Sequence, residues 1–273
     1  MTSTEFFELF LRELQSSPKL RGYYKFLEDK KSFEFRKYYF LKRLQFVERN
    51  ILQNPGFVWD CGCGYGTQCL FLAMNGIQSS GSTLEFYYDS IKKRKEYWSQ
   101  FGEVGLFNVN YENIFESHPA RESVDYILVG DTLHHLEPIN DAIQIFHKTL
   151  KTEGKIVVIE ENGSNILQRV ILYLRRGNNR IIEIEDQKLG KKILVGNENI
   201  RNISEWEKIF NADGFSILSD KVEYVRLFTP AFYNLFGAEK IKSLDSQLWR
   251  SNTLLRKYFY FGTSFIVRKT VAS

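Results

Sequence analysis

The chain has 273 residues, of which 43% are hydrophobic and 15% aromatic, and its formal net charge at pH 7 is only +4. This composition can fill the core of one α/β domain with insertions, and no apolar run approaches the roughly 18 residues of a membrane span. The small charge excludes a polycation, and three cysteines confined to residues 61–69 exclude a disulfide framework. Because the N-terminus carries acid where a signal peptide carries base, we expect a cytoplasmic protein.

Residues 1–54 are expected to form an N-terminal helical cover. The pattern from Glu5 to Gln15 is helical, and Thr2 and Glu5 have the spacing of a capping box. Between Lys19 and Arg49, ten Lys or Arg residues stand against four Asp or Glu, interleaved with aromatic residues. Such a stretch can hold nucleic acid, but its apolar residues at helical spacing favour an amphipathic helix packed on a sheet. Nucleic acid is therefore not the expected partner, and the aromatic side chains would serve as a lid or in a homodimer.

The stretch from Phe57 to Thr67, Phe-Val-Trp-Asp-Cys-Gly-Cys-Gly-Tyr-Gly-Thr, has the pattern of a ligand-binding turn. A buried strand ends at Asp60, and glycines then alternate at Gly62, Gly64 and Gly66 before an apolar helical pattern. Alternate glycines let the backbone turn sharply and let a ligand approach main-chain N–H groups. A dinucleotide fingerprint, G-x-G-x-x-G, is excluded because the third glycine comes one residue early. The run instead resembles motif I of the class I S-adenosylmethionine (SAM)-dependent methyltransferases, acid-x-G-x-G-x-G.

The resemblance implies a ribose contact at the end of the second strand, predicted from Ile77 to Thr83. Most members of the superfamily carry an acid there, because a carboxylate can accept hydrogen bonds from both ribose hydroxyls. Thr83 and Leu84 stand at this point, as Thr does in cyclopropane-fatty-acid-synthase-like and sterol-methylating members, and Glu85 lies just beyond. The ribose partner therefore stays open.

The third strand, Val104 to Asn110, is expected to supply the adenine contact. The family generally has Asp at the position of Asn110, where it binds the adenine amino group. The carbonyl oxygen of Asn can accept the same hydrogen bond. Asn110 and the following Tyr111 are therefore candidates for the adenine site.

The fourth strand is predicted from Ser123 to Asp131, followed by Thr132-Leu-His-His-Leu. This run resembles the family signature in which a strand that begins with Phe-Asp is followed by Leu-His-His-Leu. Ile156 to Glu160 then matches the apolar strand that closes the family pattern. His135 is the candidate for a general base, with His134 second, although in many relatives these side chains cap a turn without moving a proton.

The predicted fold is a doubly wound α/β fold with a seven-stranded, mostly parallel sheet, an N-terminal helical cover, and helical insertions after strands 5 and 6. The methyltransferase domain spans residues 55–273, with insertions near 162–202 and 227–257. In the first insertion, an apolar helix from Ile166 with a basic end would act as a lid or packing helix, or would touch a lipid surface or a hydrophobic substrate.

The candidate contacts share one edge of the sheet, because the carboxyl ends of parallel strands meet there. The candidate cofactor-binding residues are Asp60, Gly62, Cys63, Gly64, Gly66, Thr83, Leu84, Asn110, Tyr111, Gly130, Asp131 and Thr132. We predict no metal site, because Asp131 is the single carboxylate expected at the loops where a catechol-type site needs several.

The expected activity is methyl transfer from SAM, and the acceptor follows by elimination. The chain lacks the N-P-P-Y-type tetrad of enzymes that methylate amino groups of bases or glutamine, and it lacks the cysteine beside proline of cytosine-C5 enzymes. A small, apolar or aromatic molecule is therefore expected, with an oxygen, nitrogen or carbon acceptor atom. Two alternatives stay open: a SAM-binding module without catalysis, and a methyltransferase that acts on RNA or protein.

Overall fold

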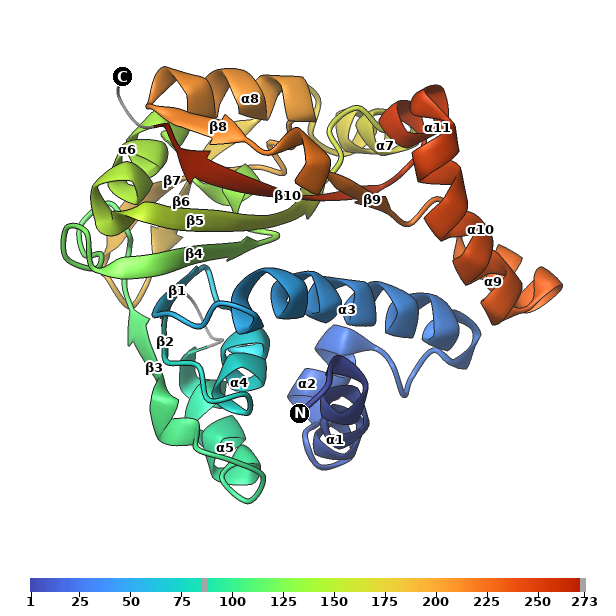
Figure 1. The fold of residues 1–273 in the computed structure, drawn as a ribbon, viewed down its shortest axis with the longest axis horizontal. Coiled ribbons are helices and arrows are strands. Elements are labelled where there is room, and N and C mark those ends of the chain that lie inside the picture. Colours follow the sequence, from blue (N-terminus) through green and yellow to red (C-terminus); the bar gives the residue numbers. More distant parts are fainter. Residues whose placement is uncertain (85–87, 271–273) are drawn as a thin grey trace.

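The computed structural model describes residues 1–84 and 88–270, so Glu85 lies outside the described residues. Its main sheet has the strand order β3-β2-β1-β4-β5-β10-β8, and β9 pairs with β10 beside β8 (Figure 1). The strands of this sheet are β1 (Val58–Cys61), β2 (Ser79–Thr83), β3 (Phe107–Tyr111), β4 (Val124–Gly130), β5 (Leu150–Glu161), β8 (Phe215–Ile217), β9 (Glu223–Val225) and β10 (Gly262–Lys269).

The sheet is mostly parallel, which confirms the predicted fold class. Strands β1 to β5 pair in parallel, whereas β10 is antiparallel to both β5 and β8. The sequence pattern predicts one strand from Phe215 to Arg226, but the chain forms two short strands there. A 3-10 turn over Ser219–Lys221 separates β8 from β9, and both pair with β10.

Helices cover both faces of the sheet because side chains alternate along each strand. In β4, Tyr126 and Leu128 point to one core, whereas Ile127 and Val129 point to the other. The first core is covered by the N-terminal helices, α4 (Thr67–Ala73) and α5 (Tyr88–Trp98), and the second by α6 (Ile139–Thr149) and α8 (Ile203–Ala212).

Three N-terminal helices, α1 (Ser3–Ser16), α2 (Pro18–Tyr24) and α3 (Phe33–Val47), pack beside the glycine-rich turn. The predicted capping box of Thr2 and Glu5 is confirmed at the start of α1. A buried ion pair joins α1 to α5, with Arg94 donating to both carboxylate oxygens of Glu13 at 2.7 Å. Arg94 also donates to the carbonyl oxygen of Tyr65 at 2.7 Å, so this pair ties the helical cover to the turn.

The two inserted segments have different structures. The first holds α7 (Ile166–Arg176) and an antiparallel hairpin of β6 (Ile181–Asp186) and β7 (Lys191–Gly196), a hairpin that the sequence reasoning missed. The second holds α9 (Pro230–Phe236), α10 (Ala238–Ser251) and α11 (Thr253–Tyr258). Within the described part of the chain, no helix has both the length and the apolar character needed to cross a bilayer.

Candidate functional site

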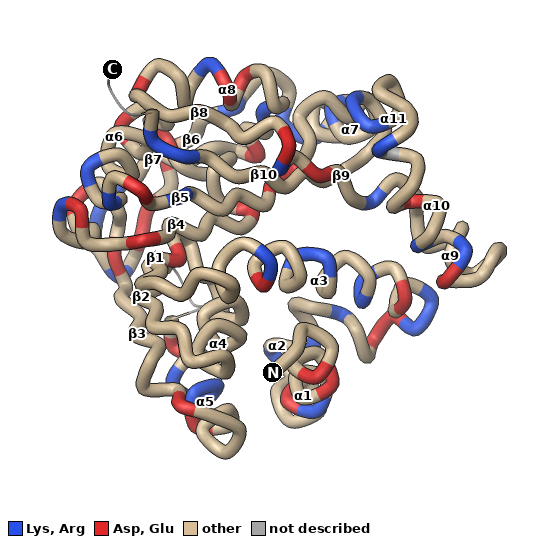
Figure 2. The backbone as a smooth tube through the Cα atoms, viewed as in Figure 1, with Lys and Arg blue, Asp and Glu red and all other residues tan. Residues whose placement is uncertain are grey.

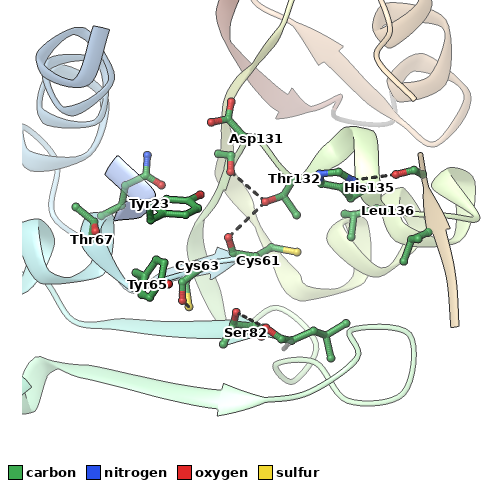
Figure 3. A pocket seen from close by; sticks show the side chains of 18 of the residues that line it. Tyr23, Cys61, Cys63, Tyr65, Thr67, Ser82, Asp131, Thr132, His135 and Leu136 are labelled. Carbon is green, nitrogen blue, oxygen red and sulfur yellow. Dashed lines mark hydrogen bonds between the residues drawn. The ribbon is translucent and has the colours of Figure 1, made fainter. Parts of the chain in front are cut away.

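A cavity of about 830 Å³ lies at the carboxyl ends of β1, β2 and β4, between the N-terminal helices and the hairpin β6–β7. Nine of the predicted site residues line it: Gly62, Cys63, Gly64, Thr83, Leu84, Gly130, Asp131, Thr132 and His135. Five others do not: Asp60, Gly66, Asn110, Tyr111 and His134. In Figure 3, Tyr23 and Tyr65 lie on one side of this cavity and Asp131, Thr132 and His135 on the other.

The three glycines of the turn have different surroundings, although each has a positive φ. A Cβ on Gly62 would lie 2.4 Å from the side chain of Thr132, and one on Gly66 would lie 2.7 Å from the ring of Phe107. A Cβ on Gly64, whose φ is +53°, would meet no atom within 4 Å. Gly62 and Gly66 therefore allow close packing, whereas Gly64 leaves open space at the cavity wall.

Asp60 lies buried beneath the turn rather than in the cavity. Its Oδ2 accepts a hydrogen bond from the Cys69 thiol at 3.2 Å. Burial raises the pKa of Asp60 to about 7, although the Cys69 hydrogen bond and the charge of Arg43 act in the opposite direction. The structure therefore places the Asp60 carboxylate against helix α4 and outside the cavity.

A carboxylate that the sequence reasoning missed lies at the ends of β2 and β3. Glu112 lines the cavity, and its carboxylate accepts hydrogen bonds from the Ser82 hydroxyl and, at 2.9 Å, from the Ser117 hydroxyl. Asn110 and Tyr111 instead line a second, smaller cavity, where the Tyr111 hydroxyl donates to Asp186. The available signal was the acid two residues after Asn110.

His134 belongs to a buried cluster outside the cavity, which we call the clamp, in which Glu160 holds the His134 side chain and the backbone of Thr132 and Leu133. Its Nδ1 lies 2.6 Å from Glu160, which also accepts from the backbone N–H of Thr132 and Leu133. Burial alone would lower the pKa of His134, but the Glu160 carboxylate outweighs it and raises the pKa to about 9. The clamp therefore carries a protonated imidazole at neutral pH and fixes the loop that follows β4.

His135 is placed differently, because it is exposed and lines the cavity. Its Nδ1 lies 2.9 Å from the carbonyl oxygen of Gly196 in β7 (Figure 3). A carbonyl oxygen only accepts, so Nδ1 carries the proton and donates it. In the neutral ring, Nε2 is then left with a free lone pair.

One group of potential metal ligands comes together among the described residues. Ligand atoms of His134, His135 and Glu198 lie within 4.8 Å of one another. Nε2 of His134 lies 3.7 Å from the Glu198 carboxylate, and the raised pKa of His134, about 9, makes this contact an ion pair at neutral pH.

Several buried polar atoms around the cavity have no hydrogen-bond partner among the described residues. Arg43 forms an ion pair with Asp131, and Arg226 forms one with Glu161. Other polar atoms of Asp131 and Arg226 nevertheless have no hydrogen-bond partner among the described residues. The unsatisfied atoms of cavity-lining residues are Arg36 Nε, Tyr39 Oη, Gln68 Nε2, Asp131 Oδ1 and Arg226 Nε. Buried polar groups normally have partners, so a group of unsatisfied ones around one cavity indicates a site for a polar ligand group.

The hairpin β6–β7 gives the cavity an apolar wall. Ile182 pairs with Val195 and Ile184 with Ile193. Because paired residues of antiparallel strands share a face, all four side chains lie on the side that lines the cavity. Aromatic residues of α3, Phe35, Tyr39 and Phe40, line it as well. The cavity therefore combines apolar and aromatic walls with a few polar groups, which is typical of small-molecule sites.

Comparison with known proteins agrees with this geometry. Residues 59–158 match a family model described as a methyltransferase domain, and no curated protein sequence matches the chain. A SAM-dependent methyltransferase from Methanosarcina mazei is 16% identical, with a TM-score of 0.56 over 83% of this chain and 98% of that one.

Two further similar structures contain ligands. Phosphoethanolamine N-methyltransferase 2 of Haemonchus contortus, in complex with SAM, is 15% identical, with a TM-score of 0.55 over 84% of this chain and 52% of that one. The 1,6-didemethyltoxoflavin-N1-methyltransferase of Burkholderia thailandensis, with bound S-adenosylhomocysteine (SAH), is 13% identical, with a TM-score of 0.50 over 84% and 77%. Residues 59–158 therefore match a methyltransferase domain, and the chain has the fold of these SAM-dependent methyltransferases.

Proposed function

We propose that this protein transfers the methyl group of SAM to a small acceptor with an apolar or aromatic body. The observation that supports this proposal most strongly is the composition of the cavity. Its walls include the hairpin residues Ile182, Ile184, Ile193 and Val195, the aromatic residues of α3 and the glycine-rich turn. Bound SAM supplies a methyl group already activated on a sulfonium, so the chain has to align the acceptor and manage its proton.

The residues around the turn suit the cofactor. Gly64 leaves room for a ligand beside the main chain. Glu112 follows β3, but its carboxylate is hydrogen-bonded to Ser82 near the end of β2, where the ribose contact is expected. Thr132 closes the opposite side, where its hydroxyl donates to the carbonyl oxygen of Gly130 at 3.0 Å. We assign the ribose hydroxyls to Glu112, since Thr83 donates its hydroxyl to the carbonyl oxygen of Leu84.

The Glu112 assignment predicts that Glu112→Gln weakens SAM binding about tenfold, because a charge-assisted pair of hydrogen bonds becomes a neutral one. Equilibrium dialysis with labelled SAM measures the loss. Glu116→Gln is the matched control, because Glu116 lies in the same segment but lines the second cavity and pairs with Lys191. An unchanged affinity in Glu112→Gln would place the ribose elsewhere.

His135 is the proposed general base, acting through Nε2 on a proton of a hydroxyl or amine acceptor. His134 is less suited to this role, since its imidazole is protonated at neutral pH and lies outside the cavity lining. The hydrogen bond from Nδ1 to Gly196 holds the His135 ring in one orientation, which is what a base in a positioned site requires.

Replacement of His135 by alanine is expected to lower turnover at least about tenfold with SAM affinity unchanged, because only proton transfer is lost. The assay follows labelled methyl from SAM into the best acceptor of a panel of small phenols, aromatic amines and aromatic acids. His118→Ala, which removes an exposed imidazole outside the cavity, is the control. A loss of less than about threefold would reject the base.

The acceptor panel also tests the proposed function itself. Two of the similar proteins are named as methyltransferases of phosphoethanolamine and of 1,6-didemethyltoxoflavin, which are small molecules, and this supports the panel as the first choice. Phe26 and Phe40 of the basic N-terminal stretch are buried, so they are not available to stack on RNA bases. Methylation of RNA or protein, with none of any small acceptor, would overturn the proposal.

A further inference from the structure

Helix α7 presents its apolar face away from the protein. Six of its apolar side chains are exposed: Ile166, Leu167, Val170, Ile171, Tyr173 and Leu174. Among the residues of this helix only Leu172 is buried. At about 100° per residue, the six exposed side chains cover an arc of roughly 160°, and Leu172 lies on the opposite side with Gln168 and Arg176. An ordinary surface helix has the reverse arrangement.

Basic residues border this apolar arc. Arg169 lies beside Tyr173 at one edge of the arc, and Arg175 lies beside Ile171 at the other. Both are exposed, and within the described residues neither forms an ion pair with an acid. Residues 162–182, which contain the helix and the turn after it, include no Asp or Glu. Figure 2 shows basic and no acidic segments on α7.

The neighbouring helix α11 also exposes apolar side chains. The side chain of Asn165, the N-cap of α7, donates to the carbonyl oxygen of Phe259 at 2.7 Å, which fixes α7 against the end of α11 (Figure 1). Leu254 and Phe259 are exposed there, and Arg256 and Lys257 lie between them in sequence. Residues 246–269 also include no Asp or Glu.

We propose that the apolar face of α7, continued by α11, docks the protein on an anionic lipid surface. A helix with a large apolar face, bordered by cations and free of acids, has the features of a helix that lies in the plane of a bilayer interface. The apolar side chains would enter the acyl boundary while the arginines contact lipid phosphates. With 11 residues, α7 is far shorter than the roughly 20 residues of a span, so it would lie on the bilayer.

The charge pattern favours lipid over a second copy of the chain. Two α7 faces packed together would bring Arg169 and Arg175 of both copies close to one another, with no acids in residues 162–182 to compensate. Like charges brought together in this way oppose association. Anionic headgroups instead complement every cation at the border.

The test is sedimentation of the full-length protein with vesicles of phosphatidylcholine alone and of equal parts phosphatidylcholine and phosphatidylglycerol. We expect binding to the mixed vesicles that weakens with salt, and a loss of about tenfold or more in Leu174→Glu. The Arg169→Gln/Arg175→Gln variant should lose binding to a similar degree. The matched control is Leu235→Glu, because Leu235 of α9 is 74% exposed and Leu174 is 78% exposed.

The proposal would be overturned if the wild-type protein did not bind the mixed vesicles or if Leu174→Glu bound them as well as the wild type. It would also be overturned if Leu235→Glu lost as much binding as Leu174→Glu. Light scattering without lipid tests the alternative that a second copy of the chain covers this face. A wild-type dimer that Leu174→Glu converts to a monomer, together with no binding to vesicles, would assign the face to a second copy. Unchanged circular dichroism and SAM binding of the variants separate these results from failure to fold.

Discussion

Arginine in place of Gly64 is expected to abolish binding of SAM and SAH without unfolding the protein. The Cβ of any residue at 64 would enter open space at the cavity wall, so the long side chain would occupy the volume that the cofactor needs. Affinity should fall by at least about a hundredfold. Equilibrium dialysis with labelled SAM measures the fall.

A second arginine variant separates blocked space from backbone strain. Gly76 has a φ of +75° and no atom within 4 Å of an added Cβ, so Gly76→Arg imposes a similar conformational cost. Gly76 does not line the cavity. SAM affinity should survive in this variant, and an equal loss in both variants would show that strain rather than occlusion is responsible.

Substitution of His134 by glutamine should remove stability in a pH-dependent way. The folded-state pKa of His134 is about 9, above the about 6.5 expected for the unfolded chain. A raised pKa contributes stability that is fully present below about pH 6.5 and is lost as pH rises through about 9. The shift corresponds to about 3 kcal/mol of unfolding free energy.

Urea unfolding of wild type and His134→Gln at pH 6 and at pH 10 tests this expectation. The difference between the two proteins should be larger at pH 6 by about 3 kcal/mol. The control is His147→Gln, because burial lowers the pKa of His147 and its stability contribution has the opposite dependence on pH. A difference for His134→Gln that is the same at both pH values would mean that its imidazole is neutral in the clamp.

The sheet could be predicted because its strands carry strong local patterns. In β4 and β5 every residue of the central run is apolar, as expected for strands buried on both faces. The alternating glycines, the strand ends and the Leu-His-His-Leu run then place the candidate residues at one edge. All of these signals lie within short stretches of sequence.

Glu112 could not be assigned from the sequence because its position depends on the length and twist of β3. The family pattern predicts a contact at Asn110. In the structure, the residues that line the cavity begin two positions later, with Glu112 and Asn113. The hairpin β6–β7 had a signal in the alternation of Ile182, Glu183, Ile184 and Glu185. That alternation identifies a strand but not the cavity that its apolar face lines.

The sequence also leaves undetermined how a side chain or a helix face is oriented, as the two histidines and α7 show. Adjacent histidines in sequence differ only in what their ring nitrogens meet in three dimensions: Glu160 for His134 and the carbonyl oxygen of Gly196 for His135. Likewise, the periodicity of residues 166–176 predicts an amphipathic helix. It does not indicate which face packs on the protein, and here the apolar face points outward.

Calorimetric titration of the wild-type protein with SAM and then with SAH tests whether the cavity beside Gly64 is a SAM site. We expect one binding site with micromolar affinity for each ligand. Absence of binding to both ligands would contradict this expectation, because the cavity beside Gly64 would then serve a different ligand in the same fold.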